Sequence, residues 1–249
     1  MNEQREKMRL QAYLASCGLG SRRACEKLIL EGRVSINSQT ATLGQSVSPG
    51  DIVRFDERIA KPQTRLRYIA LNKPPGFVTS MADEKGRPVA SSLLGNSVEE
   101  RVYNIGRLDQ WSSGLLLFTN DGDLTALMVH PSGLIEKEYH VETDLPIPPT
   151  FADQFMAGIL VEGIRYKAES VRVESEKTMS VVLIEGKNRE IRRVLEHFGL
   201  RAMLLRRMRI GPIELGDLVE GSHRELTQGE VAALRGFSAE KRHARGTRS

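Results

Sequence analysis

The stretch from residue 102 to 119 constrains the fold most, because it places a short charged loop between two strand-like segments. The β-type segment Val102 to Ile105 leads into Gly106-Arg107-Leu108-Asp109, and the loop closes with Ser112-Ser113-Gly114. The run Leu115 to Phe118 is apolar without alternation, which favours a buried strand. Two glycines therefore bracket a tight loop that carries one cation and one carboxylate, and Asp109 is the candidate reactive group.

Length and composition favour two domains. With 249 residues, of which 40% are hydrophobic and 27% charged, the chain can bury a sizeable core and still leave room for a small second domain. The two cysteines form no disulfide pattern, which is typical of a reducing compartment and makes the cytoplasm the expected location. The charged N-terminus and the lack of a long apolar run argue against export and against membrane insertion.

Positive charge is concentrated in three stretches. Residues 1–67 hold 12 Lys or Arg against 7 Asp or Glu, residues 239–249 hold 4 against 1, and residues 186–209 hold 8 against 2. Such clusters are typical of proteins that neutralise nucleic-acid phosphates. On charge alone, a solvated surface of salt bridges is an equal alternative.

The N-terminal residues predict a small module of two helices followed by a short sheet. Leu10, Leu14 and Cys17 recur at helical spacing, and Ser21 is suited to cap a second helix that Gly32 ends. The order of these signals resembles the S4-type RNA-binding domain, which implies that residues 1–60 bind RNA. Arg22 and Arg23 stand in the first helical turn, where the helix dipole favours phosphate. These two residues and Arg33 are the RNA-binding candidates of the module.

The rest of the chain predicts an α+β fold. Polar residues 61–67 are expected to be a linker, residues 68–238 a larger domain, and residues 239–249 a basic flexible tail. Strand patterns outnumber helix patterns, which favours a mixed, largely antiparallel sheet flanked by helices. The expected strands include 161–166, and the expected helices include 150–159, 188–198 and a last one that Thr227 and Glu230 cap.

Several chemistries lack support in the sequence. The five histidines show no ligand spacing and lie apart from the cysteines, so no metal site is expected. The chain has neither a P-loop nor a GxGxxG motif, and Gln110 stands where a serine-hydrolase elbow needs glycine.

Three features distinguish Asp109 from an ordinary surface carboxylate. It lies in a glycine-bracketed loop, Tyr139 on a later strand offers an aromatic face, and the predicted helix 188–198 begins among cations. Arg189, Arg192 and Arg193 are spaced to share one helical face, so one can reach a carboxylate while the others and Lys187 face phosphates. The alternatives are a half-buried strand tyrosine and a helix-surface ion pair between Arg192 and Glu196.

The successive motifs resemble the RsuA-type family of ribosomal pseudouridine synthases. They are Lys73 to Gly76, Gly106 to Asp109 with 113–122, Lys137 to Tyr139, and Glu185 to Arg193. The resemblance implies that Asp109 is catalytic, that Tyr139 stacks on the target base, that Arg192 pairs with Asp109, and that Arg107 touches RNA. Lys73 is grouped with the RNA-binding residues, although bracing of the proline turn is an equal alternative.

The implied reaction is the conversion of uridine to pseudouridine, which needs no cofactor. An ionised carboxylate requires only fixing in place, which we expect from a bidentate guanidinium. The expected partner is ribosomal RNA or a ribosomal subunit assembly intermediate, and the protein is expected to be a monomer without a membrane partner. The loop from Asp83 to Pro88 favours the large-subunit branch of the family. A small-subunit target and a non-catalytic ribosome-assembly factor are the alternatives.

Overall fold

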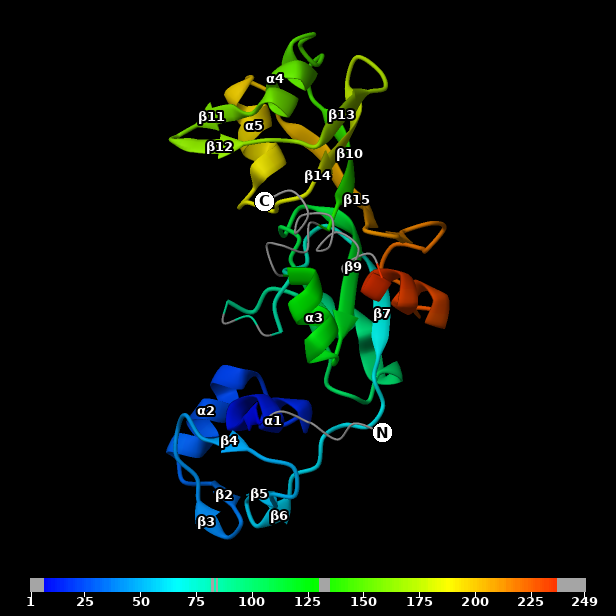
Figure 1. Ribbon diagram of the computed structural model, residues 1–249. Helices are drawn as coiled ribbons and strands as arrows, with labels where there is room; N and C mark the ends of the chain where they lie inside the picture. The colour runs from blue at the N-terminus through cyan, green and yellow to red at the C-terminus, as the bar shows by residue number, and fades with distance from the viewer. Residues whose placement is uncertain (1–6, 82, 84, 130–134, 237–249) are drawn as a thin grey trace. The chain divides into compact units, whose positions relative to one another are not determined.

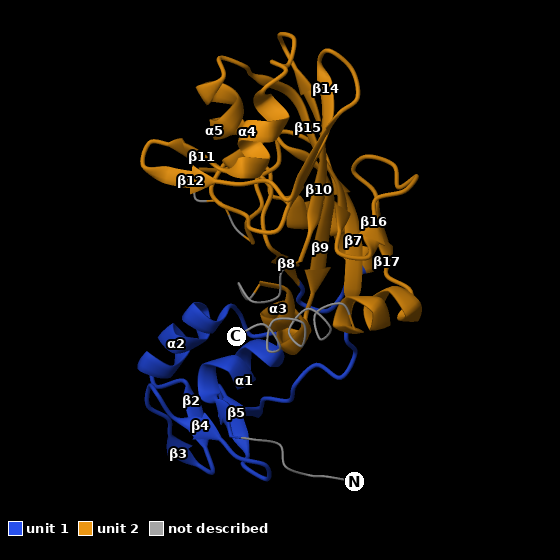
Figure 2. Ribbon diagram, turned by 45° about the horizontal axis from the view of Figure 1, so that its top comes forward, with its two compact units in different colours: residues 1–66, 98–102 blue, residues 67–97, 103–249 orange. Residues whose placement is uncertain are grey.

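The chain folds into two units, which Figure 2 shows in different colours. The computed structural model describes residues 7–81, 83, 85–129 and 135–236, so the expected basic tail 239–249 lies outside the described residues. Unit 1 contains residues 1–66 with 98–102, and unit 2 contains residues 67–97 with 103–249. Arg67, at the end of the expected linker, is already part of unit 2.

Unit 1 has the predicted two helices followed by short strands, and one further two-residue strand precedes the helices. Helix α1 (Leu10–Ser16) and helix α2 (Arg22–Leu30) pack around a core that includes Leu14, Cys25 and Val53. The strands form one four-stranded sheet in the order β3 (Gln39–Thr40), β2 (Val34–Ile36), β5 (Val53–Phe55) and β6 (Arg58–Ile59), and a separate pair of β1 (Met8–Arg9) with β4 (Ser46–Val47). The predicted cap of α2 is confirmed, because Ser21 Oγ accepts a hydrogen bond from the Ala24 amide at 3.1 Å.

Unit 2 is built on a mixed sheet, as predicted. Its main path runs β13 (Ser170–Val173), β14 (Thr178–Leu183), β10 (Lys137–Thr143), β15 (Ala202–Ile210), β9 (Ser113–Thr119), β7 (Tyr68–Lys73) and β17 (His223–Glu225); β8 (Tyr103–Ile105) pairs with β9, and β16 (Ile213–Glu214) pairs with β15. Among the described strand pairs of this sheet, only β15 and β9 run parallel. The expected α+β class is confirmed.

The apolar run after the glycine loop is the buried strand β9, as the sequence predicts. Every residue of β9 is buried, and Leu115 and Leu117 pack with Leu124 and Met128 of helix α3 (Gly122–Val129). Figure 1 shows α3 beside β9, while helix α4 (Phe151–Ala157), helix α5 (Glu190–His197) and the hairpin of β11 (Ile159–Val161) and β12 (Ile164–Tyr166) gather at the end of the sheet where β13 and β14 lie. A short 3-10 helix (Ala90–Ser97) precedes β8.

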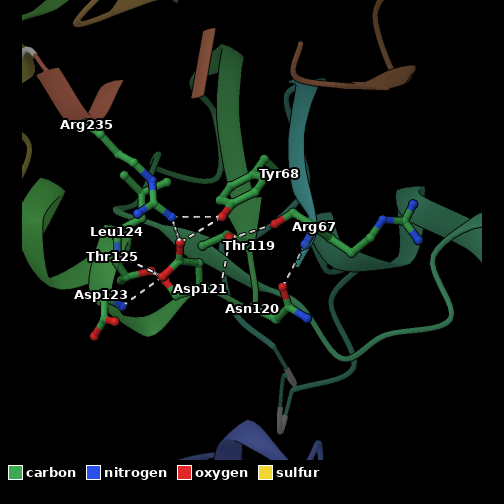
Figure 3. Close-up of polar contacts among 9 residues, drawn as sticks. All are labelled: Arg67, Tyr68, Thr119, Asn120, Asp121, Asp123, Leu124, Thr125 and Arg235. Carbon is green, nitrogen blue, oxygen red and sulfur yellow. Dashed lines mark hydrogen bonds and ion pairs between the residues drawn. The ribbon is translucent and has the colours of Figure 1, made fainter. Parts of the chain in front are cut away.

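A polar network fixes the connection between β9 and α3 (Figure 3). Asp121 is 6% exposed, and its Oδ1 accepts the amides of Asp123 and Leu124, both at 3.0 Å. Its Oδ2 accepts the Tyr68 hydroxyl at 2.8 Å and Arg235 Nη2 at 2.5 Å. One carboxylate therefore caps α3 and joins it to β7 and to the helical residues 228–236. The predicted cap of 228–236 is also confirmed, because Thr227 and Glu230 exchange hydrogen bonds at 2.8 and 3.2 Å.

Three local predictions were wrong. The expected single strand 161–166 is the β11–β12 hairpin, because Glu162 and Gly163 both adopt positive φ and reverse the chain. Thr150 has helical backbone angles and makes no side-chain capping bond, so the capping box expected there is absent. The expected helix 188–198 begins at Glu190, since Arg189 has a left-handed φ of 51°. None of the described helices is long and apolar enough to cross a membrane.

Candidate active site

The loop that carries Asp109 is held through its backbone. Each of the seven carbonyl oxygens from residue 106 to residue 112 accepts a hydrogen bond. For the carbonyls of residues 106 to 109, taken in that order, the donors are Asn104 Nδ2, Arg207 Nη1, Thr79 Oγ1 and the Ser112 amide. The Gln110 carbonyl accepts both the Gly76 amide and Lys73 Nζ. The Trp111 carbonyl accepts Arg192 Nη2, and the Ser112 carbonyl accepts Lys73 Nζ. A loop that is anchored at every carbonyl has little freedom to change conformation. The backbone that carries the Asp109 side chain is therefore held in place before any ligand arrives.

Lys73 lies beneath this loop. Its side chain is 0% exposed, and Nζ donates to the carbonyls of Pro74 at 2.9 Å, Gln110 at 3.2 Å and Ser112 at 2.7 Å. Burial lowers the pKa of Lys73 to about 8, although the negative charge of Asp109 opposes the shift. The prediction that Lys73 binds RNA was wrong, because a fully buried ammonium with three carbonyl acceptors cannot reach a phosphate. The alternative of a bracing role is what the geometry shows.

Asp109 opens into a cleft of about 1110 Å³ in unit 2. The cleft brings together five of the predicted site residues, which are Arg107, Asp109, Tyr139, Lys187 and Arg189. Apolar side chains of the sheet and helices complete the wall, among them Met128, Leu183, Ile191, Leu205 and Ile210. A concave site with an apolar wall and a few convergent polar groups suits a planar, partly polar ligand such as a nucleobase.

Arg192 and Asp109 are neighbours but do not form the expected bidentate pair. Arg192 Nε lies 3.9 Å from Asp109 Oδ2, while Nη2 donates to the Trp111 carbonyl at 3.1 Å and lies 3.4 Å from Ser112 Oγ. Nε itself is buried and has no hydrogen-bond partner among the described residues. The guanidinium therefore anchors the loop and faces the carboxylate with an unused donor. The expected alternative pairing of Arg192 with Glu196 is absent, because Glu196 accepts from Arg189 at 3.2 Å instead.

The floor of the cleft carries two cations that flank Tyr139. Tyr139 is 9% exposed on β10 and lies opposite Arg207 of β15. Arg207 is 2% exposed and donates from Nε to the Leu115 carbonyl at 2.7 Å; its Nη2 is buried and meets no acceptor in the described part of the chain. Lys137 donates to the carbonyls of Ile135 and Ile184 at 2.9 and 3.0 Å. Burial, followed by repulsion from Arg207, lowers the pKa of Lys137 to about 8.

The cations before and within α5 point in different directions. Lys187 forms an ion pair with Glu185 at 2.7 Å, whereas Arg193 reaches Glu162 of the β11–β12 hairpin at 2.6 Å. Arg189 precedes the helix, so the single face predicted for Arg189, Arg192 and Arg193 does not form. Lys187 and Arg189 line the cleft and Arg193 does not.

The buried residue Glu190 shapes the turn before α5. Its side chain is 3% exposed, and Oε2 accepts the Lys187 amide at 3.1 Å. Burial raises the pKa of Glu190, and backbone hydrogen bonds from Lys187 and Lys167 oppose the shift. The carboxylate thus ties the 185–189 turn, with its cations, to the wall of the cleft.

Unit 1 presents its predicted cations in two ways. Arg22 and Arg23 are exposed in the first turn of α2, which contains no acidic residue. Arg33 forms a bidentate ion pair with Asp56, and its guanidinium carbon lies 4.7 Å from the centroid of the Phe55 ring. The hydrogen bonds to Asp56 raise the pKa of Arg33. The charge of Arg33 is therefore balanced within unit 1, while Arg22 and Arg23 stand in the first turn without a counter-charge there.

A second hollow of about 620 Å³ lies on another side of the Asp109 loop. Arg107 and Asp109 line both hollows, and Gln110, Thr79, Asp83 and Arg87 complete the smaller one. Asp83 organises its own loop, because it accepts the Arg87 guanidinium at 2.6 Å and the Arg87 amide at 2.8 Å. These contacts lower the pKa of Asp83 to about 2.

Sequence reasoning missed Arg207 as part of the cleft, and it named Lys137 and Glu190 only as parts of motifs. Neither Arg207 nor Lys137 carries a local signal, since each appears in the sequence as one basic residue among many. The one hint is that two adjacent basic residues, Arg206 and Arg207, interrupt the apolar strand pattern of 203–208; successive strand residues face opposite sides, so one of the two is expected to be buried.

Comparison with known proteins identifies the matching families. The sequence profile described as RNA pseudouridylate synthase matches residues 67–197, and the S4 domain profile matches residues 8–53. An uncharacterized RNA pseudouridine synthase of Borreliella burgdorferi is 38% identical over 232 residues, which cover 91% of this chain and 93% of that protein. The dual-specificity RNA pseudouridine synthase RluF of Escherichia coli K12 is 37% identical over 91% of this chain and 78% of its own length.

Two further similarities extend this result. The ribosomal large subunit pseudouridine synthase B of Xanthomonas campestris is 38% identical over 91% of this chain, which spans 49% of that longer protein. A crystal structure of a pseudouridylate synthase superposes with a TM-score of 0.68 at 27% identity and covers 91% of this chain and 99% of that one. The similarity therefore includes both units and the loop of Asp109.

Proposed function

The chain belongs to the RNA pseudouridylate synthase family and is an RNA pseudouridine synthase, and from this premise we propose that it isomerises a uridine of large-subunit ribosomal RNA through Asp109. The observation that carries the proposal is the Asp109 loop, whose carbonyls are all anchored while its carboxylate faces a cationic cleft. Pure RNA binding gains nothing from a carboxylate placed among phosphate-seeking cations. The non-catalytic alternative is therefore set aside.

The reaction needs few groups. The N1–C1′ bond of uridine breaks, the base turns, a C5–C1′ bond forms, the C5 proton leaves, and N1 gains a proton, with no net redox change. In the proposal, Asp109 acts as nucleophile at C1′ or at C6, or as the base that takes a ribose proton on a glycal route. The unused Nε of Arg192 stabilises the carboxylate, and Tyr139 stacks on the extruded uracil.

The remaining cations are assigned to the RNA backbone. Arg107, Lys187 and Arg189 line the cleft, and we assign them to phosphates next to the target nucleotide. Arg22 and Arg23 of the S4 domain hold another part of the RNA, with smaller contributions from Arg33 and Arg193, which are ion-paired and do not line the cleft. The S4 match at residues 8–53 supports this division of labour between the two domains.

The choice of large-subunit RNA rests on the relatives. The Xanthomonas relative is named for the ribosomal large subunit, and RluF is named for dual specificity on RNA. With ribosomal RNA or an assembly intermediate as substrate, the enzyme works in the cytoplasm. It does so as a monomer in this proposal, because one chain supplies every residue assigned to the cleft.

A tritium-release assay tests the role of Asp109. Ribosomal RNA labelled at uracil C5 releases tritium when pseudouridine forms, and we expect Asp109→Asn to lower the rate by more than about a thousandfold, the scale on which removal of a reacting group acts. The matched control is Asp153→Asn, which removes an exposed carboxylate in the first turn of α4 and is expected to retain full activity.

The same assay can contradict the proposal. Equal tritium release by wild type and Asp109→Asn would exclude Asp109 as the reacting group. Mapping pseudouridines in ribosomal RNA from a deletion strain then identifies the target. A missing modification in small-subunit RNA, with large-subunit RNA unchanged, would replace the large-subunit assignment.

A further inference from the structure

Trp111 is the only tryptophan of the sequence, and it lies two residues after Asp109. Its side chain is 66% exposed, which is unusual for the largest apolar side chain on a folded domain. No hydrogen bond or ring contact of the indole occurs among the described residues. The protein therefore keeps a large aromatic face in water beside its reacting group.

The backbone under Trp111 is rigid. The Trp111 carbonyl accepts Arg192 Nη2 at 3.1 Å, and the carbonyls on either side, of Gln110 and Ser112, accept Lys73 Nζ. Asp109 and Ser112 close a turn around it with a 3.1 Å hydrogen bond. An aromatic ring on a fixed backbone loses only side-chain freedom when a ligand stacks on it, so the entropic cost of binding is small.

Exposure differs from residue to residue along the loop. Leu108 and Ser112 are buried, whereas Arg107 and Trp111 are exposed and Asp109 is 34% exposed at its side chain. The loop thus leaves a cation, a carboxylate and an aromatic ring accessible to a ligand; Arg107 and Asp109 line the cleft, whereas Trp111 lines neither hollow and is exposed beside them in the chain. The neighbours of Trp111 in the chain face different hollows, since Gln110 lines the smaller one and Ser112 lines the cleft. In the chain, Trp111 therefore lies between a residue of the smaller hollow and a residue of the cleft.

This arrangement matches an RNA strand that has delivered one nucleotide into the cleft. Two residues span at most about 7 Å, so the indole lies within one or two nucleotides of a base that Asp109 can reach. Nucleobases stack on aromatic side chains with little dependence on sequence, and the indole N–H can also donate to a base edge or a phosphate. Arg107 and Arg189 supply the positive field that keeps the strand there.

We infer that Trp111 is a stacking platform for the nucleobase that adjoins the target uridine and that it acts in substrate binding, separately from the chemical step. The inference rests on the proposed function. It adds to Tyr139, which is assigned to the target base itself, a second aromatic contact that takes a neighbouring base.

Kinetics with tritiated large-subunit ribosomal RNA transcript provide the first test. We expect Trp111→Ala to raise KM by about 5- to 100-fold, the scale of one lost base stack, while kcat stays within about twofold. Trp111→Phe restores most of the affinity because it keeps a π-face, and Trp111→Leu, which is apolar without one, does not. Met203→Ala is the control, because Met203 is an apolar side chain of similar exposure, 71%, on β15 and lies outside the Asp109 loop.

Fluorescence provides the second test. Excited at a wavelength that the five tyrosines do not absorb, full-length Asp109→Asn protein emits from Trp111 alone, and we expect unlabelled transcript to quench this emission. Tritium release by wild type without quenching, or with equal KM for Trp111→Ala, overturns the inference and leaves the proposed function intact. Quenching without tritium release by wild type leaves the stacking role and contradicts the isomerase assignment for this RNA. If neither quenching nor tritium release occurs, the stacking role and the isomerase assignment are both overturned.

Discussion

Lys73 illustrates how one buried side chain prepares the reaction. Its ammonium group donates to three carbonyls, two of which belong to the loop that carries Asp109 and Trp111. The positive charge also lies close enough to Asp109 for the two to attract, as the opposing effect of Asp109 on the pKa of Lys73 shows. Lys73 therefore positions the reacting group without touching the substrate.

The lowered pKa of Lys73 makes folding stability depend on pH. Between about 8 and the ordinary lysine value of 10.5, the folded state has lost a proton that the unfolded state still holds, so the free energy of unfolding rises with pH in this window. We expect the difference in unfolding free energy between wild type and Lys73→Met to shift by roughly 2–3 kcal/mol in favour of wild type from pH 7.5 to pH 10.

Urea unfolding of both proteins at the two pH values measures this shift. Because the comparison at each pH removes the contribution of the groups that both proteins share, no further correction is needed. A difference that stays constant with pH would show that Lys73 does not titrate in this window. Tritium release at pH 7.5 adds a second readout, and we expect Lys73→Met to lower kcat because the Ser112 carbonyl loses its donor and the Gln110 carbonyl keeps only the Gly76 amide.

At the scale of elements, the site depends on one parallel strand pair. β9 and β15 meet at Gly114 and Arg207, which places Arg207 against the loop and on the floor of the cleft. Gly114 has a φ of 98°, and a Cβ at this position would lie 2.7 Å from the Arg207 amide nitrogen and still closer to its carbonyl oxygen. Only glycine allows the two strands to approach this closely.

We expect Gly114→Ala to destabilise unit 2 by more than about 3 kcal/mol, because an overlap of backbone atoms adds to the strain of positive φ. Gly221→Ala is the matched control: Gly221 has a φ of 80° with nothing within 4 Å of the added carbon, so strain alone costs about 1–2 kcal/mol. Urea or thermal unfolding measures both. Equal losses in the two variants would contradict a requirement for close strand approach.

The whole molecule combines two units with separate hydrophobic cores and separate cationic surfaces. Unit 1 has a core of its own around α1 and α2, and the exposed Arg22 and Arg23 lie at the positive end of α2. Unit 2 contains the cleft and its own cations. Binding of RNA is therefore expected to depend on phosphate contacts from both units, and the salt dependence of affinity counts these contacts.

The double variant Arg22→Ala/Arg23→Ala is expected to bind ribosomal RNA transcript more weakly and to reduce the slope of log affinity against log salt by about 1.4 to 1.8. Filter binding between about 50 and 200 mM salt measures the slope. Lys27→Ala, in the last turn of the same helix, is the matched control and should leave the slope close to the wild-type value. An unchanged slope in the double variant would remove α2 from the RNA interface.

Much of the fold could be predicted because its signals are local. Ser21 and Thr227 mark helix starts, the run 115–118 marks a strand buried on both faces, and Gly106 and Gly114 mark the loop between strands. Each of these signals acts within a few residues, through capping bonds, apolar periodicity or backbone freedom. The hairpin at Glu162 was missed because a non-glycine residue takes positive φ there.

By itself, then, the sequence determined the two domains, the mixed sheet and the grouping of Arg107 and Asp109 on one loop. Tertiary structure alone decided where the basic side chains lie: Lys73 is buried beneath the loop, Arg193 faces the β11–β12 hairpin, and Arg207 lies on the floor of the cleft. The physical reason is distance along the chain. Arg207 meets Gly114 only after β15 pairs with β9, and no local pattern encodes contacts between residues so far apart.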